Sequence, residues 1–318
     1  MLLSFVIPCY RSENTIRKVC DEIRSIVAQR EGYDYEIICV NDCSPDKVYD
    51  ELVRLSSEDK KIKVINFAKN MGKHAAVLAG YSVIKGEIVV NLDDDYQSPM
   101  EHLWELVDPV ADNECDVATA NYSQKKQSIW KNIGSKINYW ISAIMLEKPK
   151  GLRFDNFYVL KRFVAKEMVR YHHPYAFLEG LIVRTTSRIM TVQMDERERG
   201  DANTTGYTLK KSVELFLNGF TAFSVKPLRL STGVGLFTAF LGFVWAIILI
   251  VRKFMYPEIE IGYTSIAVFV LIIGGIQLIS QGMLGEYIGR IYICMNASPQ
   301  YVIRETINIE LGDENENS

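Results

Sequence analysis

The sequence predicts an α/β protein in which a doubly wound parallel sheet is followed by a two-helix transmembrane hairpin. Within residues 1–120, short apolar runs rich in β-branched residues alternate with stretches of helical periodicity. This alternation is typical of a parallel sheet with right-handed crossovers. Further along, two long runs contain no charged residue, from Val234 to Val251 and from Tyr263 to Leu284. A chain of 318 residues is long enough for both parts.

The apolar runs of the N-terminal part are short, as expected for strands that are covered on both faces. The predicted strands are "LLSFVIP", "YEIICV", "IKVINFA", "EIVVNLD" and "DVATAN". Predicted helices lie between them, at about 13–29, 46–58, 73–84 and 99–112. For the last of these helices, Ser98 is the expected N-cap and Pro99 the first helical residue.

Each uncharged run is long enough to cross the hydrocarbon core of a bilayer, which takes about 20 helical residues. The alternative, two buried helices of a soluble protein, is less favoured because neither run shows a polar stripe. The short connection places both chain ends on one side, and an excess of flanking basic residues favours the cytoplasmic side. These residues are Lys226, Arg229, Arg290 and Arg304, against Arg252 and Lys253 in the connection.

The predicted organisation is therefore a cytoplasmic domain at 1–227, a transmembrane hairpin at 228–290 and a cytoplasmic tail at 291–318. The two membrane helices are expected at about 233–253 and 263–285. Such a protein is a multi-pass protein of the inner (plasma) membrane.

Composition excludes some classes of function. A net charge of −3 and a pI near 5.9 do not supply the basic face that nucleic acid requires. The six cysteines show no regular spacing, which favours reduced, buried thiols over a disulfide framework. The first residues, "MLLSFVIPCY", lack a basic n-region and contain a proline, so we interpret them as a strand and not a signal peptide.

Polar residues follow four of the predicted strands. Ligands of doubly wound sheets bind beyond the carboxyl ends of the strands, so these residues are expected to converge on one rim. They are Pro8, Tyr10 and Glu13 after the first strand, Asp42 after the second, Asn70 to Lys73 after the third, and Asp93 to Asp95 after the fourth.

Their chemistry suits a nucleotide diphosphate. Asp93 and Asp95 are one residue apart, so both can point to the same side, where carboxylates suit Mg²⁺ or Mn²⁺. Asp94 is then expected to point away, toward a backbone group or solvent. Asp42 is placed to accept hydrogen bonds from a base or ribose, and Lys73 to neutralise a diphosphate. An Asp-x-Asp triplet is expected by chance in a chain of this composition. The prediction of a nucleotide site therefore depends on the other polar residues of the rim.

The ordered set P-C-Y-x-x-E, V-N-D-x-S-x-D, N-x-G-K and D-D-D-Y-Q-S-P resembles family 2 glycosyltransferases of the Rossmann-like GT-A fold. The later stretches "YTLKKSVELFLNGFTAFSVKPLRL" and "LGEYIGRIY" resemble the polyprenyl-phosphate glycosyltransferases related to dolichol-phosphate mannose synthase. The resemblance covers the chain from Phe5 to about Tyr301. It implies that Asp95 holds the metal, with Asp93, and that Asp42 contacts the nucleotide.

The resemblance also implies a reaction. It is the inverting, metal-dependent transfer of a sugar from a nucleotide sugar to undecaprenyl phosphate at the cytoplasmic membrane face, in cell envelope polysaccharide biosynthesis. UDP is the first choice of nucleotide, GDP the second, and relatives often form tetramers. A phosphate acceptor needs no general base, because its second pKa is about 6. It needs cationic positioning instead.

Two stretches offer such positioning. Lys125 and Lys126 precede an amphipathic, interfacial helix, although a lysine run is more commonly a solvated face. The second stretch, "RERGDANTTGYTLKK", supplies Arg199, Thr205, Tyr207 and Lys210, with Arg197 nearby. In the family it commonly reads R-x-x-G-x-S/T-x-Y; Asn203 replaces the glycine here, and Arg199 is one residue too far upstream. Asn156 also departs from the family pattern D-F-R, and Asp155 receives no role.

Several histidines and one charged pair have simpler interpretations. His74 is expected either to contact the diphosphate or to cap a helix, and His172 and His173 to form a turn. Glu286 and Arg290 are expected to form a structural ion pair.

Other functions stay open. A processive polysaccharide synthase is disfavoured because the chain lacks a Q/R-x-x-R-W motif and further membrane helices. A membrane-tethered family 2 enzyme acting on another glycan or lipid acceptor is the main alternative. The non-enzymatic alternative is a membrane scaffold or transporter subunit.

Overall fold

A computed structural model describes residues 1–122, 154–173, 176–195, 197, 226–256, 263–295 and 299–309. The chain forms two compact units, each with its own contacts. The first comprises residues 1–206 together with 298–318, and the second comprises residues 207–297.

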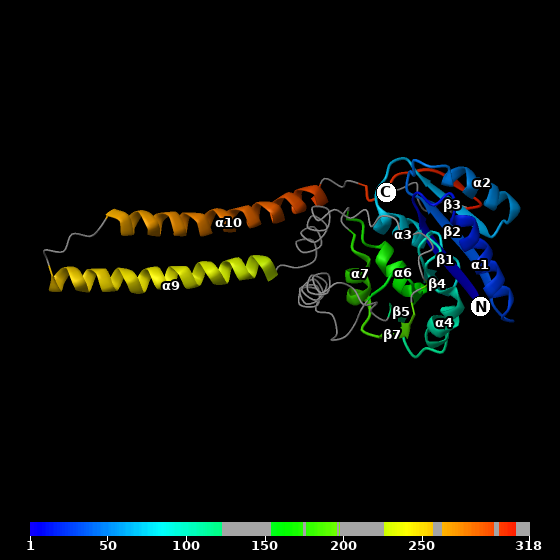
Figure 1. Cartoon of the computed structure of the whole chain (residues 1–318), viewed down its shortest axis with the longest axis horizontal. Helices are drawn as coiled ribbons and strands as arrows, with labels where there is room; N and C mark the ends of the chain where they lie inside the picture. Colours follow the sequence, from blue (N-terminus) through cyan, green and yellow to red (C-terminus); the bar gives the residue numbers. More distant parts are fainter. Residues whose placement is uncertain are drawn as a thin grey trace. The chain divides into compact units, whose positions relative to one another are not determined.

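In the first unit, the described residues form one eight-stranded sheet (Figure 1). The strand order across the sheet is β7-β5-β6-β4-β1-β2-β3-β8. The strands β3, β2, β1 and β4 are parallel neighbours, and β5 and β7 are also parallel to each other. The strands are β1 (Leu2–Cys9), β2 (Asp34–Asn41), β3 (Ile62–Phe67), β4 (Ile88–Asn91), β5 (Val117–Tyr122), β6 (Tyr158–Lys161), β7 (Ile189–Met194) and β8 (Ile303–Ile307).

The five predicted strands are all present, but the sheet is mixed and not purely parallel. Strand β6 lies between β4 and β5 and is antiparallel to both. Strand β8 is antiparallel to β3 at one edge. The sequence analysis did not predict β6, β7 or β8. Strand β6 has only four residues, too few for a period-two pattern to stand out.

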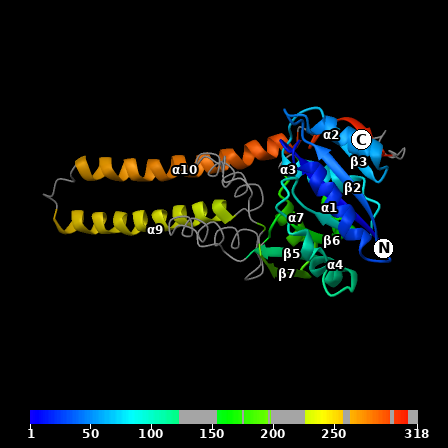
Figure 2. The ribbon, with the colours of Figure 1, turned by 45° about the vertical axis from the view of Figure 1, so that its right-hand side comes forward.

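Helices cover both faces of the sheet, as Figure 2 shows from a second side. On one face lie α1 (Ile16–Ala28), α2 (Val48–Glu58) and α4 (Leu103–Ala111). Helix α3 (Lys73–Ser82) packs on β1 and β2 from the other face, next to α6 (Arg162–Val169), which in turn contacts α7 (Leu178–Thr185). The doubly wound arrangement is therefore confirmed.

One helix start differs from the prediction. A 3₁₀ turn, η1 (Met100–His102), precedes α4, and its N-cap is Pro99, which makes no side-chain capping hydrogen bond. The expectation that Ser98 caps a helix beginning at Pro99 was wrong. Ser98 is instead buried.

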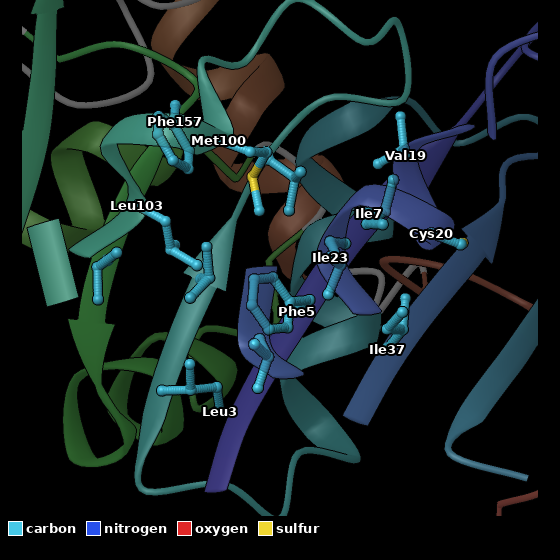
Figure 3. Close-up of a cluster of buried hydrophobic side chains, with 14 of the residues drawn as sticks. Leu3, Phe5, Ile7, Val19, Cys20, Ile23, Ile37, Met100, Leu103 and Phe157 are labelled. Atoms are coloured by element: carbon cyan, nitrogen blue, oxygen red, sulfur yellow. The ribbon is translucent and has the colours of Figure 1, made fainter. Parts of the chain in front are cut away.

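The main core lies between the sheet and α1, α2 and α4. Alternate residues of β1, Leu3, Phe5 and Ile7, point into it because side chains alternate along a strand. Figure 3 shows Phe5 near the centre of this cluster, with Ile23 of α1 and Leu103 of α4 on either side. All of these side chains are excluded from solvent. Such close packing holds the strands, and the loops that follow them, in fixed positions.

The opposite face is packed just as closely. A Cβ atom at Gly80 of α3 would lie 2.4 Å from Val6 Cγ1 of β1. Only glycine allows the helix to approach the sheet so closely, and this approach fixes the position of Lys73 at the start of α3.

The second unit is a helical hairpin of α9 (Lys226–Met255) and α10 (Tyr263–Met295). Ser231 Oγ donates a hydrogen bond to Ser280 Oγ at 2.8 Å, and the rings of Trp245 and Phe269 lie 5.7 Å apart. Many large apolar side chains are exposed along both helices, including Leu236 and Leu278. No helix within the described ranges is long and apolar enough to qualify as a membrane span. The predicted membrane crossing therefore stays a prediction.

The residues after α10 complete the sheet of the first unit. Strand β8 pairs with β3, and the Tyr301 ring stacks on Phe67 with 5.4 Å between centroids. Asn308 donates hydrogen bonds to the backbone oxygens of Ser56 and Ile62, both at 2.8 Å. This part of the predicted tail is thus built into the sheet.

Candidate active site

The rim at the carboxyl ends of β1, β2, β3 and β4 brings the predicted polar loops together, because these strands are parallel neighbours. Pro8 is buried within β1, whereas Tyr10 is exposed. The backbone N–H of Asp42 donates to the oxygen of Cys9 at 3.1 Å, which joins the first two loops.

Asp93 is held by two polar side chains. The Lys73 ammonium forms an ion pair with Asp93 Oδ1, and Asn156 Nδ2 donates to Asp93 Oδ2 at 2.8 Å. Both partners donate hydrogen bonds to one carboxylate and so hold Asp93 in one orientation. The pair also places the ammonium of Lys73 at the aspartate triplet, and its contact with a diphosphate stays a prediction.

Asp94 turns away from this pair, as predicted. Its Oδ2 accepts a hydrogen bond from the Tyr10 backbone N–H at 2.8 Å, and its backbone oxygen accepts one from Thr15 Oγ1 at 2.6 Å. Burial, together with the charges of Asp93 and Asp95, raises the pKa of Asp94 to about 6. Asp94 therefore fastens the triplet to the loop after β1.

Asp95 is exposed on the rim, and its Oδ1 accepts the Gln97 backbone N–H at 3.1 Å. Between these two residues, Tyr96 has a φ of +63°, in the left-handed region that non-glycine residues seldom adopt. The chain thus turns sharply just after the triplet.

Asp42 organises the loop before α3. Its Oδ1 accepts the Met71 N–H at 2.6 Å and its Oδ2 accepts the Gly72 N–H at 2.9 Å. Gly72 has a φ of +88° and serves as the N-cap of α3, so this backbone turn requires glycine. Burial raises the Asp42 pKa, which its two backbone donors oppose. The carboxylate that was predicted to meet a base or ribose has a structural role; its contact with a nucleotide stays a prediction.

Glu13 links the first two loops. Its carboxylate accepts the Lys47 N–H at 2.9 Å, while its own N–H donates to Asp46 Oδ2 at 3.0 Å. These two hydrogen bonds hold the segments just before α1 and α2 next to each other. A nucleotide contact of Glu13 likewise remains a prediction.

His74 does not cap α3, since the helix start has no side-chain capping hydrogen bond. Its ring lies 5.9 Å from that of Phe177 in an edge-to-face arrangement. Its buried Nδ1 has no hydrogen-bond partner among the described residues. Burial and the charge of Lys73 lower its pKa to about 4, so the imidazole is neutral at pH 7.

Two residues that received no role from the sequence lie at the site. Asn156 contacts Asp93, and Asp155 lies close enough for the charges of Asp93 and Lys73 to act on it. Burial, and to a smaller extent the charge of Asp93, raises the Asp155 pKa to about 6. Hydrogen bonds from the backbone N–H groups of Asn156 and Phe157 act in the opposite direction. Both residues reach the rim because β6 pairs with β4, where Tyr158 lies opposite Asn91. In the sequence, the one signal that pointed to these residues was the departure of Asn156 from the family pattern D-F-R.

The donor atoms fit a hard divalent cation. Asp93 and Asp95 offer carboxylate oxygens just after β4, which are the ligands that such a cation prefers. Among the described residues, no three histidine, cysteine or acidic side chains are grouped so that they could enclose a metal ion. The site therefore fits a cation that takes most of its ligands from a diphosphate and water.

The predicted acceptor residues lie outside the described residues. They are Lys125, Lys126, Arg199, Thr205, Tyr207 and Lys210. The side chains of Glu286 and Arg290 are also not described, so their ion pair stays a prediction. His173 lies in a non-helical segment, where its backbone oxygen accepts a hydrogen bond from Gln300 Nε2 at 3.0 Å.

Comparison with known proteins decides the family. Residues 4–168 match Glycosyl transferase family 2, and residues 226–291 match the GtrB C-terminal hairpin. The chain belongs to glycosyl transferase family 2. This family 2 glycosyltransferase is 31% identical to the undecaprenyl-phosphate 4-deoxy-4-formamido-L-arabinose transferase of Yersinia enterocolitica, over 99% of its own length and 96% of the relative. It is 30% identical to the SfII prophage-derived bactoprenol glucosyl transferase of Shigella flexneri, over 96% and 98% of the two chains.

Solved structures support the fold of this family 2 glycosyltransferase. Mannosyl-3-phosphoglycerate synthase from Rubrobacter xylanophilus matches with a TM-score of 0.52 and 17% identity, over 72% of this chain and 74% of that one. Glucosyl-3-phosphoglycerate synthase from Mycobacterium tuberculosis, in complex with Mn²⁺, UDP-glucose and phosphoglyceric acid, matches with a TM-score of 0.50 and 19% identity, over 68% and 76%. At these identities, the matches show the fold alone.

Proposed function

We propose that this family 2 glycosyltransferase transfers one sugar from a UDP-sugar to polyprenyl phosphate. The observation that carries the proposal is similarity over nearly the whole chain, hairpin included, to two enzymes. Their names state undecaprenyl phosphate and bactoprenol as acceptors. The rim geometry agrees with this reaction, because it gathers carboxylates and one ammonium where a diphosphate would leave.

On the donor side, Asp95 and Asp93 would hold Mg²⁺ or Mn²⁺, which stabilises charge on the departing diphosphate. The Lys73 ammonium, which pairs with Asp93, would also contact the diphosphate and neutralise part of its charge. Asn156 would keep the Asp93 carboxylate in place. Asp94 and Asp42 would keep their loops in register through the backbone hydrogen bonds that they accept. Pro8, Tyr10 and Glu13, in β1 and the loop after it, would contact the nucleotide.

On the acceptor side, we propose that the hairpin of α9 and α10 lies in the membrane and that both chain ends are cytoplasmic. The support comes from the uncharged runs of the sequence and from large exposed side chains such as Leu236, which is 74% exposed. The helices as described do not themselves meet the requirement for a span. Lys125, Lys126, Arg199, Thr205, Tyr207 and Lys210 would position the lipid phosphate.

A second candidate function is transfer to a hydroxyl group of another glycan or lipid. Asp155 favours it, because a carboxyl group with a pKa near 6 beside Asp93 could serve as a general base. A phosphate acceptor needs no such base. The nature of the acceptor therefore decides between the two functions.

The test is an acceptor comparison with the purified full chain. The protein is incubated with Mn²⁺, a panel of UDP- and GDP-sugars, and either undecaprenyl phosphate or undecaprenol, and the lipid products are identified by mass. The proposal expects one sugar added to undecaprenyl phosphate and none to undecaprenol. Product from undecaprenol, abolished by Asp155→Asn, would favour the second function. No lipid product from any donor would refute transfer to undecaprenyl phosphate.

A further inference from the structure

Arg197 was one of several cations in the predicted acceptor stretch, but the structure gives it a defined place. It follows β7, which ends at Met194, a buried residue of the main core. Strand β7 runs parallel to β5, and both run in the direction of β4 because β6 is antiparallel to each of its neighbours. The carboxyl end of β7 therefore lies at the same rim as the aspartate triplet.

The Arg197 guanidinium contacts three elements at once. It forms a two-pronged ion pair with Glu22 of α1, with nitrogen–oxygen distances of 2.8 and 3.2 Å. It also pairs with Glu101 of η1, and its carbon Cζ lies 4.8 Å from the centre of the Tyr96 ring. The Arg197 guanidinium thus forms ion pairs with two carboxylates and a cation–π contact with one aromatic ring.

The pair with Glu22 differs from an ordinary surface ion pair, whereas the Glu101 side chain is 54% exposed. The side chains of Arg197 and Glu22 are only 24% and 18% exposed, so water screens them less than an exposed pair. The ring under Arg197 belongs to Tyr96, the residue in the left-handed conformation between Asp95 and Gln97. A non-glycine residue keeps such a conformation only where its surroundings hold it there.

We propose that Arg197 is a positioning residue that locks the loop after the aspartate triplet. By holding Tyr96 and Glu101, it keeps the backbone turn that presents Asp95, and it fastens the chain after β7 to that loop. Because it is engaged by two carboxylates, Arg197 does not serve as a phosphate ligand in this arrangement. The inference rests on the proposed donor role of the aspartates, which it deepens.

The first test does not depend on activity. Hydrogen–deuterium exchange of the full-length protein is compared among the wild type, Arg197→Met, Glu101→Gln and the control Arg170→Met. Arg170 forms an exposed pair with Glu167 on α6, far from the triplet in sequence. We expect about 10-fold faster exchange in residues 94–99 for Arg197→Met, a smaller increase for Glu101→Gln and no change for the control. Unchanged exchange in Arg197→Met, or an equal increase throughout the first unit, would overturn the inference.

The second test uses transfer kinetics. Loss of a residue that supports a ligand typically weakens binding by about 10- to 100-fold, so Arg197→Met should raise the apparent constants for Mn²⁺ and for the nucleotide sugar in that range. The KM for the lipid should change much less, and Arg197→Lys should recover only part of the loss. An increase confined to the lipid KM would instead make Arg197 an acceptor ligand and refute the inference. A wild type without transfer activity would refute the proposed function, and the exchange experiment would still decide the role of Arg197.

Discussion

Replacing His74 with phenylalanine should remove part of the acid sensitivity of the fold. The His74 pKa is lowered from its ordinary value of 6.5 to about 4 by burial and then by Lys73. Below pH 6.5 the unfolded chain binds a proton at this residue, whereas the folded chain does so only near pH 4. His74 therefore costs stability as the pH falls through this window. The cost is about 2 kcal/mol at pH 5 and about 3 kcal/mol at pH 4.

Phenylalanine preserves the ring that packs against Phe177 and carries no titrating group. The free energy of unfolding is measured at pH 7.5 and pH 5 for the wild type, His74→Phe and the control His102→Gln, which alters an exposed side chain. We expect the wild type and the control to lose about 2 kcal/mol more than His74→Phe between the two values. The same loss in all three proteins would refute the reasoning. The chain has four histidines, so an NMR titration can also follow His74 directly, with an expected midpoint near pH 4.

Three further substitutions test other parts of the account. Lys73→Met should raise the KM for the nucleotide sugar by about 10-fold or more, because a charge-assisted hydrogen bond is lost; the exposed control Lys69→Met should not, and equal effects would contradict the role of Lys73. Glu36→Gln should cost about 3–5 kcal/mol of unfolding free energy, since it leaves the buried ammonium of Lys63 without its charge partner; a loss below about 1 kcal/mol in urea unfolding would contradict this. Asn308→Ala removes two hydrogen bonds at a residue with a φ of +58° and should cost about 2 kcal/mol; an unchanged unfolding midpoint would show that β8 adds no stability.

The central strands and the rim could be predicted because their signals are local. Each run from β1 to β5 is apolar, β-branched and bounded by polar loops, and parallel order then brings the ends of β1 to β4 together. The presence of Lys73 and Asp93 on one rim followed from this order, but their direct ion pair did not, because β1 and β2 lie between β4 and β3. Asp94 was expected to point away from its neighbours because side chains alternate along a strand. The triplet lies beyond the end of β4, however, and the Tyr10 backbone N–H orients Asp94 instead.

The remaining features depend on contacts between distant parts of the chain. Strand β6 enters between β4 and β5, and this pairing brings Asn156 to Asp93 and Asp155 close to it. No local pattern encodes such an insertion. The sequence motif indicated a nucleotide contact for Asp42, but not the hydrogen bonds by which its oxygens hold the backbone of the next loop. Arg197 looked like one cation among several, until the fold placed Glu22 and Glu101 around it.

The most direct test of the proposed reaction follows both products of one turnover. The full-length wild type, Asp95→Ala and the Lys69→Met control are incubated with Mn²⁺, undecaprenyl phosphate and the donor sugar that the panel identifies. The account predicts one nucleoside diphosphate released for each lipid that gains a single sugar, in the wild type and the control, and neither product in Asp95→Ala. Release of nucleotide without a glycosylated lipid, or full activity of Asp95→Ala with Mn²⁺ still required, would contradict it.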